Sequence, residues 1–160
     1  MQSLKGKEES IQVLKWRVAV TGFFAGLIWS AVWAFLAYFN FTKISPSSFV
    51  LQTWTQAEWM TSWYGELLSI FIISLLSIII AYIYYLFFRN LTGMMPGLIY
   101  GVAIWLILFL VFSNLFAHIP FLNELDLNTL VTTLCIMIIY GVFIGYTISY
   151  DFLDQENTSK

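Results

Sequence analysis

Length and composition place this chain in a membrane. It has 160 residues, of which 60% are hydrophobic and only 10% are charged, whereas soluble domains have roughly 45–50% and about 25%. So few charges exclude a water-soluble surface, and the length allows one domain at most. A formal net charge of −2 without a basic stripe indicates that nucleic acid is not a partner.

Four uncharged, apolar runs are each long enough to cross a bilayer. About 20 mostly apolar residues span roughly 30 Å of hydrocarbon. Backbone groups inside lipid have no water to bond, so each run is predicted to be helical. The expected transmembrane helices comprise residues 18–39, 67–88, 97–117 and 129–150.

The basic residues near the span ends predict that both termini lie in the cytoplasm. One side of the membrane receives six of them: Lys5, Lys7, Lys15, Arg17, Arg89 and Lys160. The other side receives only Lys43, and basic residues concentrate in cytoplasmic loops. We therefore expect cytoplasmic tails over residues 1–17 and 151–160, an external loop over 40–66, and an all-α, antiparallel four-helix bundle over 18–150.

The external loop and the turn after the second span carry the expected interface anchors. Residues 55–58 have the form of a capping box, flanked by Trp54 and Trp59. Together with Trp63, these rings suit the headgroup layer, although an external ligand platform is the alternative. Arg89 is expected to anchor the other end of the second span. Residues 89–96 predict a tight turn and hence an antiparallel hairpin of spans two and three.

Glycines four residues apart recur in three of the four spans. Residues at this spacing share one helix face and let two backbones approach closely. The predicted helix-packing positions are Gly22, Gly26, Gly97, Gly101, Gly141 and Gly145. Packing within the bundle is the first interpretation, and packing against a partner or lining a substrate path are the alternatives.

A seven-residue echo links the third and fourth spans. The segment LIYGVAI at residues 98–104 resembles IIYGVFI at residues 138–144. Because these helices run in opposite directions, the echo fits an inverted pair of the kind that some transporters contain. Chance recurrence in apolar sequence is the alternative.

Polar residues inside the spans are few and mild. None of the span centres holds an ionisable residue, which weighs against an ion-coupled mechanism. Asn114, with Ser74 and Ser77, forms the candidate polar pathway. Bonding to a neighbouring helix or to the carbonyl four residues back is the simpler interpretation of these side chains.

No pattern in the chain indicates catalysis or a metal site. His118 is the only histidine and has only Glu124 and Asp126 nearby in sequence, while Cys135 is the only cysteine. These groups do not supply the three or four ligands of a zinc site. The sequence therefore predicts neither an enzyme nor a cofactor.

Several stretches together resemble one family. They are VTGFFAG at 20–26, FNFTKISP at 39–46, and LC at 134–135 followed by YGVFIGYTISY at 140–150. The chain is similar to the YqhR family of small membrane proteins from Bacillus-like bacteria. The resemblance implies a multi-pass protein in the plasma membrane of a Gram-positive bacterium, in a family with no established activity. It implies no catalytic residue.

The sequence favours a non-enzymatic membrane protein that acts through helix–helix packing, as a scaffold or a regulator of a membrane partner. Besides the lipid bilayer, that partner is either a second copy of the chain or another membrane protein. The alternative is a small-solute permease or transporter subunit. A water-filled polar cavity reaching the middle of the membrane would favour transport, whereas a dry, close-packed interior would favour packing.

Overall fold

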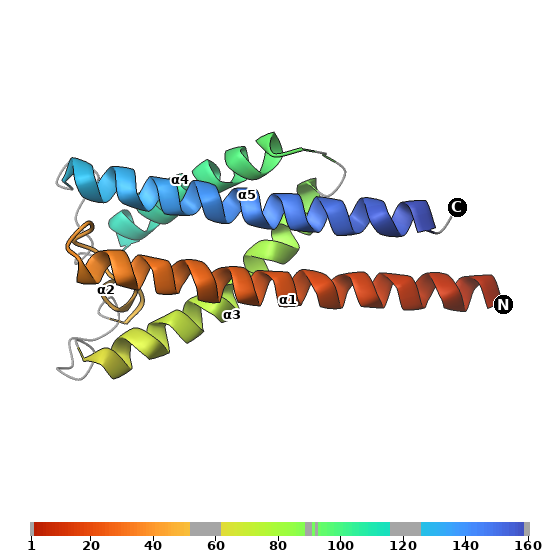
Figure 1. Ribbon diagram of the computed structural model, residues 1–160, viewed down its shortest axis with the longest axis horizontal. Helices are drawn as coiled ribbons and strands as arrows, with labels where there is room; N and C mark the ends of the chain where they lie inside the picture. Colours follow the sequence, from red (N-terminus) through yellow and green to blue (C-terminus); the bar gives the residue numbers. More distant parts are fainter. Residues whose placement is uncertain (1, 52–61, 89–90, 92, 116–125, 159–160) are drawn as a thin grey trace.

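The computed structural model describes residues 2–51, 62–88, 91, 93–115 and 126–158, which form helices and no strand. The helices are α1 (Gln2–Tyr38), α2 (Pro46–Val50), α3 (Trp63–Phe88), α4 (Met95–Leu115) and α5 (Leu127–Thr158). In Figure 1, α1 and α5 lie side by side, with both termini at one end and the short α2 at the other. The structure is all-α, as the apolar runs predict.

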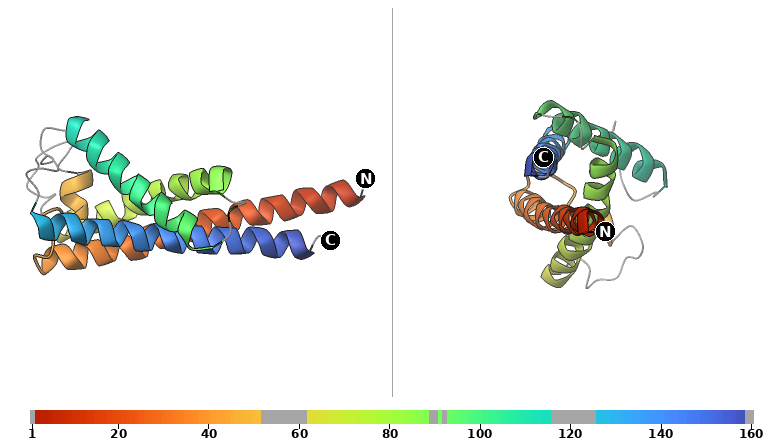
Figure 2. Two further views of the ribbon diagram at one scale, coloured as in Figure 1. Left: turned by 90° about the horizontal axis from the view of Figure 1, so that it is seen from above. Right: turned by 90° about the vertical axis from the view of Figure 1, so that its right-hand side faces the viewer.

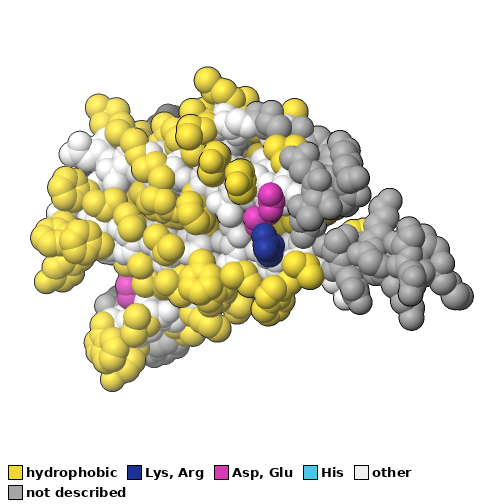
Figure 3. All heavy atoms as spheres, turned by 45° about the vertical axis from the view of Figure 1, so that its right-hand side comes forward, with side chains coloured by type: hydrophobic (Ala, Val, Ile, Leu, Met, Phe, Trp, Pro, Cys, Tyr) yellow, Lys and Arg dark blue, Asp and Glu magenta, His cyan; other side chains and the backbone are white. Residues whose placement is uncertain are grey.

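Three helices are long and apolar enough to cross a membrane. They are Ile11–Tyr38, Trp63–Phe88 and Leu127–Asp154, and the stretch Met95–Leu110 of α4 is apolar but shorter. The outer faces are apolar too, since Phe35, Ile79 and Phe87 are each more than half exposed. Hydrophobic side chains cover most of the described surface in Figure 3. A surface of this kind is stable in lipid and not in water.

The first and last helices extend beyond the expected spans. α1 begins at Gln2, although the sequence predicts a tail up to residue 17, and α5 continues to Thr158. With 37 residues, α1 is about 55 Å long, compared with roughly 30 Å of hydrocarbon. Helix formation does not stop at the lipid boundary, because the polar segment before residue 18 is rich in good helix formers.

The helices pack as two pairs. α1 packs against α3, α4 packs against α5, and contacts between α1 and α5 join the pairs. α3 and α4 do not pack along their lengths, although only a short turn connects them. They diverge toward the α2 end in Figure 1, and their ribbons cross in the view from above (Figure 2, left). The predicted hairpin of spans two and three is therefore wrong, because the glycine faces direct each helix to a different neighbour.

The α1–α3 contact places glycines of α1 against small side chains of α3. A Cβ atom added at Gly22 would lie 2.7 Å from the Cβ of Ala81. One added at Gly26 would lie 2.5 Å from the Cβ of Ser77 and 2.8 Å from the Cα of Ser74. Real Cβ atoms do not approach so closely, so any larger residue here would push the two helices apart.

The α4–α5 contact places glycine against glycine. A Cβ atom at Gly141 would lie 2.5 Å from the Cα of Gly101, and one at Gly145 would lie 2.6 Å from the Cα of Gly97. The two echo segments thus face each other across this contact. Their tyrosines both reach α3, since the Tyr100 hydroxyl donates to the Ile80 carbonyl at 2.7 Å and the Tyr140 hydroxyl lies 2.6 Å from Ser77 Oγ.

The end of the molecule away from the termini is closed by α2 and the segment before it. Ser45 caps α2, in a capping box with Ser48, and Pro46 occupies the first turn. The Trp33 indole N–H donates to the Ile44 carbonyl at 2.8 Å. The Lys43 backbone N–H donates to Thr129 Oγ1 at 3.1 Å, which fastens this segment to the start of α5.

Candidate functional site

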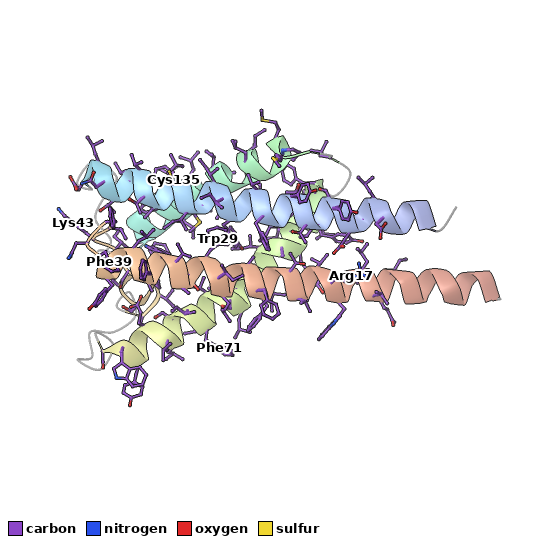
Figure 4. The ribbon with its side chains drawn as sticks, in the orientation of Figure 1. Arg17, Trp29, Phe39, Lys43, Phe71 and Cys135 are labelled. Carbon is purple, nitrogen blue, oxygen red and sulfur yellow. The ribbon has the colours of Figure 1, made fainter. Side chains whose placement is uncertain are left out.

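A cavity of about 610 Å³ lies in the opening between α3 and α4. α1 and α5 form its floor, with Trp29 and Trp33 contributed by α1. Ile72 of α3 and Leu108 of α4 stand on the two walls, and Phe49 of α2 closes one end. Figure 4 shows Trp29 in the space between α1 and α5. Ligand pockets typically measure about 300–1,000 Å³, so this cavity has the size of a binding site.

The two glycine contacts explain why the cavity exists. α3 packs against α1 at Gly22 and Gly26, and α4 packs against α5 at Gly141 and Gly145. Each close contact fixes where α3 or α4 crosses its partner, and α3 and α4 diverge toward the α2 end (Figure 1). The space left between α3 and α4 is then bordered by residues that no helix covers, such as Leu76, which is 49% exposed.

The lining of the cavity is almost wholly apolar, and the hydroxyls of Ser77 and Tyr140 in its floor are already bonded. The Ser77 hydroxyl donates to the Gly22 carbonyl at 2.6 Å. Its single proton is then used, so the Tyr140 hydroxyl is the donor in the 2.6 Å bond between Tyr140 and Ser77. This chain of bonds joins α5, α3 and α1 in the buried floor, and it engages the protons of both hydroxyls.

Three other serines in the membrane helices bond within their own helix. The hydroxyls of Ser30, Ser69 and Ser74 donate to the carbonyls of Gly26, Gly65 and Ile70 respectively, at 2.6, 2.8 and 2.7 Å. Hydroxyls in apolar helices commonly bond in this way. Of the candidate polar pathway, Ser77 alone lines the cavity, and the side chain of Asn114 lies outside the described residues.

The expected interface anchors are described only in part. Trp63 begins α3 and is 62% exposed, and its ring centroid lies 3.7 Å from that of Tyr64. Both rings therefore stand at the start of a membrane helix, where headgroups would meet them. Trp54, Trp59, Arg89 and the predicted capping box at 55–58 lie outside the described residues.

Charged and metal-binding groups are sparse over the described part of the chain. It brings together no group of three histidine, cysteine, aspartate or glutamate side chains that would hold a metal ion. Cys135 is exposed on α5, and His118 falls outside this part. Arg17 and Asp151 form an ion pair at 3.2 Å, which links α1 and α5 just beyond the apolar stretches. Sequence analysis missed this pair, although each residue adjoins an expected span on the same side.

Comparison with known proteins decides the family. The family model described as conserved membrane protein YqhR matches residues 2–160. The chain belongs to the YqhR family. A relative from Bacillus subtilis (strain 168), "Uncharacterized protein YqhR", is 39% identical over 160 residues, covering 99% of this chain and 88% of the relative. No solved structure matches the chain.

Membership of the YqhR family confirms the resemblance drawn from the segments at residues 20–26, 39–46 and 140–150. It also agrees with the apolar helices in assigning the chain to a membrane, and the Bacillus relative suggests a Gram-positive bacterium. The family description names a location and no activity. Any function therefore has to be argued from the cavity and the packing around it.

Proposed function

We propose that this YqhR protein is a non-enzymatic membrane protein that acts by binding, and that the cavity between α3 and α4 is its binding site. The observation that carries the proposal is the apolar lining of this cavity, together with the engaged hydroxyls of Ser77 and Tyr140 in its floor. Such a lining offers no acid, base or nucleophile to a substrate. It offers a polar solute nothing to replace its water.

In this proposal the chain crosses the membrane four times, with both termini in the cytoplasm. α4 has 21 residues, which is about 31 Å and enough to cross the hydrocarbon. The ends of α1 and α5 at one side of the molecule support an even number of crossings. The excess of basic residues on that side supports its cytoplasmic orientation.

We propose that the physiological role is that of a scaffold or a regulator of a membrane partner. The partner would not bind the glycine faces. The glycine faces are occupied within the chain, because Gly22 and Gly26 contact α3 while Gly97 and Gly141 lie in the α4–α5 contact. A partner would therefore respond to whether the cavity is occupied, or it would bind the outer faces and the protruding ends of α1 and α5.

Thiol labelling in intact cells tests this proposal against a permease. In a Cys135→Ser background, single cysteines replace Leu108 in the cavity, Leu106 on the same helix, and Phe41, which is 56% exposed at the α2 end. A membrane-impermeant maleimide should label Phe41→Cys, while Leu108→Cys and Leu106→Cys should react only after denaturation. Rapid labelling of Leu108→Cys in intact cells would reveal a water-filled route and favour transport.

A further inference from the structure

The volume of the cavity favours an occupant much smaller than a transmembrane helix. A transmembrane helix is about 10–12 Å wide and rises about 5.4 Å per turn, so one turn fills roughly 400–600 Å³. The cavity measures about 610 Å³ and therefore holds little more than one turn. A partner helix needs about 20 residues to cross the bilayer, so only a small part of it would lie within this cavity.

The length of the cavity matches one half of a bilayer. Ile72 and Ile80 both line it on α3, and the eight steps between them rise about 12 Å. One leaflet contributes about 15 Å of hydrocarbon, which is half of the roughly 30 Å core. A chain-like hydrocarbon from a single leaflet therefore has the right length, and it is much thinner than a helix.

Neither water nor empty space suits this cavity. A buried water needs two to four polar partners, and the hydroxyls of Ser77 and Tyr140 are already bonded to protein atoms. An empty space would deprive the surrounding side chains, including Trp29 and Ile104, of dispersion contacts. Hydrocarbon is the filler that fits this lining, and the surrounding membrane supplies it.

The entrance lies on the side of the molecule and the closed end lies at α2. Leu76 both lines the cavity and is 49% exposed, so the cavity opens between α3 and α4. Phe49 and Val50 of α2 line it at the end away from the termini. The segment before α2 is held to α1 by the bond from Trp33 to Ile44. A ligand therefore enters from the surrounding lipid through the opening between α3 and α4, while α2 and the segment before it close the end of the cavity.

We infer that the cavity binds one acyl chain of a phospholipid, taken from the leaflet at the α2 end of the molecule. The inference rests on the proposed function, which makes this cavity the binding site, and it adds the ligand's chemistry and direction of entry. The chain lies between Ile72 and Leu108, and its tip points toward the floor formed by Ser77 and Tyr140.

Photolabelling in reconstituted vesicles tests the inference. The full-length protein is placed in phosphatidylglycerol vesicles in which one acyl chain carries a diazirine near its middle. After irradiation, mass spectrometry locates the adducts. We expect adducts on the cavity-lining segments of α3 and α4. Leu108→Trp and Ile72→Trp, which fill the cavity from opposite walls, should each lower this labelling about tenfold, equivalent to about 1.4 kcal/mol of binding free energy.

The matched controls carry the same substitutions on outward positions of the same helices. Leu106 and Ile79 are 42% and 58% exposed and do not line the cavity. Leu106→Trp and Ile79→Trp should keep the wild-type adducts. Equal labelling in all four variants would mean that lipid only surrounds the protein, which would overturn the inference. Absence of lipid adducts from these segments in the wild-type protein, while the outer faces of the same helices are labelled, would also overturn it.

Melting temperatures in detergent, measured for each variant, separate loss of binding from loss of folding. The two cavity walls provide independent variants, so one poorly folded variant does not decide the result. Failure of this test would leave the thiol-labelling result intact, because a dry cavity without a phospholipid chain still excludes a permease. Labelling of Leu108→Cys by the impermeant reagent would instead refute the proposed function itself.

Discussion

The two glycine contacts differ in what faces the glycine. In the α1–α3 contact, Gly22 faces the Ala81 side chain and Gly26 faces that of Ser77. In the α4–α5 contact, Gly141 faces the backbone of Gly101. The first contact keeps side chains that a substitution can remove, whereas the second has none left to remove. Backbone atoms of α3 also lie within 3.0 Å of a Cβ added at Gly22 or Gly26, so the α1–α3 contact is adjustable in part from both helices, whereas the α4–α5 contact is fixed by the backbone.

The largest effect is expected from Gly141→Ala. Its new Cβ atom would lie 2.5 Å from the Cα and N atoms of Gly101 and from the carbonyl oxygen of Gly97. Backbone atoms cannot rotate away, so the helices must separate. We expect a loss of about 3 kcal/mol in the free energy of unfolding, measured by thermal unfolding of the purified protein in detergent.

Gly93→Ala provides the matched control for that substitution. No atom lies within 4 Å of the position where its Cβ would stand, but its φ of +104° is unfavourable for alanine. The expected cost is about 1 kcal/mol of backbone strain. If Gly93→Ala destabilised the protein as much as Gly141→Ala, backbone contact across the α4–α5 pair would not be the cause.

A smaller and reversible effect is expected from Gly22→Ala. Its Cβ atom would meet the Cβ of Ala81 at 2.7 Å, and the cost should be about 2 kcal/mol. Adding Ala81→Gly moves the methyl group from one helix to the other, so the double variant should regain about half of the loss. Simple additivity of the two melting-temperature changes would contradict the adjustable nature of the α1–α3 contact.

The smallest effect is expected from Ser77→Ala. This change removes the hydroxyl that bonds both the Gly22 carbonyl and Tyr140, and hydrogen bonds between membrane helices contribute about 0.6–1 kcal/mol. Tyr140→Phe should cost a similar amount, and the double variant should cost less than the sum. A double-mutant cycle of unfolding free energies measures this coupling, and a value of zero would show that the two hydroxyls act independently.

The sequence predicts the helices and their glycine-lined faces better than it predicts which helices pack against each other. The apolar run beginning at residue 67 ends at Phe88, as α3 does, because lipid makes every apolar run of that length a helix. A four-residue glycine spacing marks a face without saying which helix will cover it. That choice depends on the shapes of both surfaces, so the α1–α3 and α4–α5 pairing and the divergence of α3 from α4 were not predicted.

The cavity has no signature of its own in the sequence. Its lining comes from five helices, and residues such as Trp29, Phe49 and Leu108 are ordinary apolar residues in their own segments. The helix α2 does have a local signature, since Ser45 precedes Pro46 and Ser48 follows at the third position. That signature was overlooked because the segment lies within a stretch that was interpreted as one loop.

The pairing of the helices also bears on how the chain is made. α1 and α3 both precede the turn near residue 91, and α4 and α5 both follow it. Each half of the polypeptide therefore contains a complete glycine contact, formed between helices that are neighbours in order of synthesis. Contacts that are local in sequence form with little loss of chain entropy. The cavity, in contrast, belongs to neither half and comes into being only when the finished halves meet.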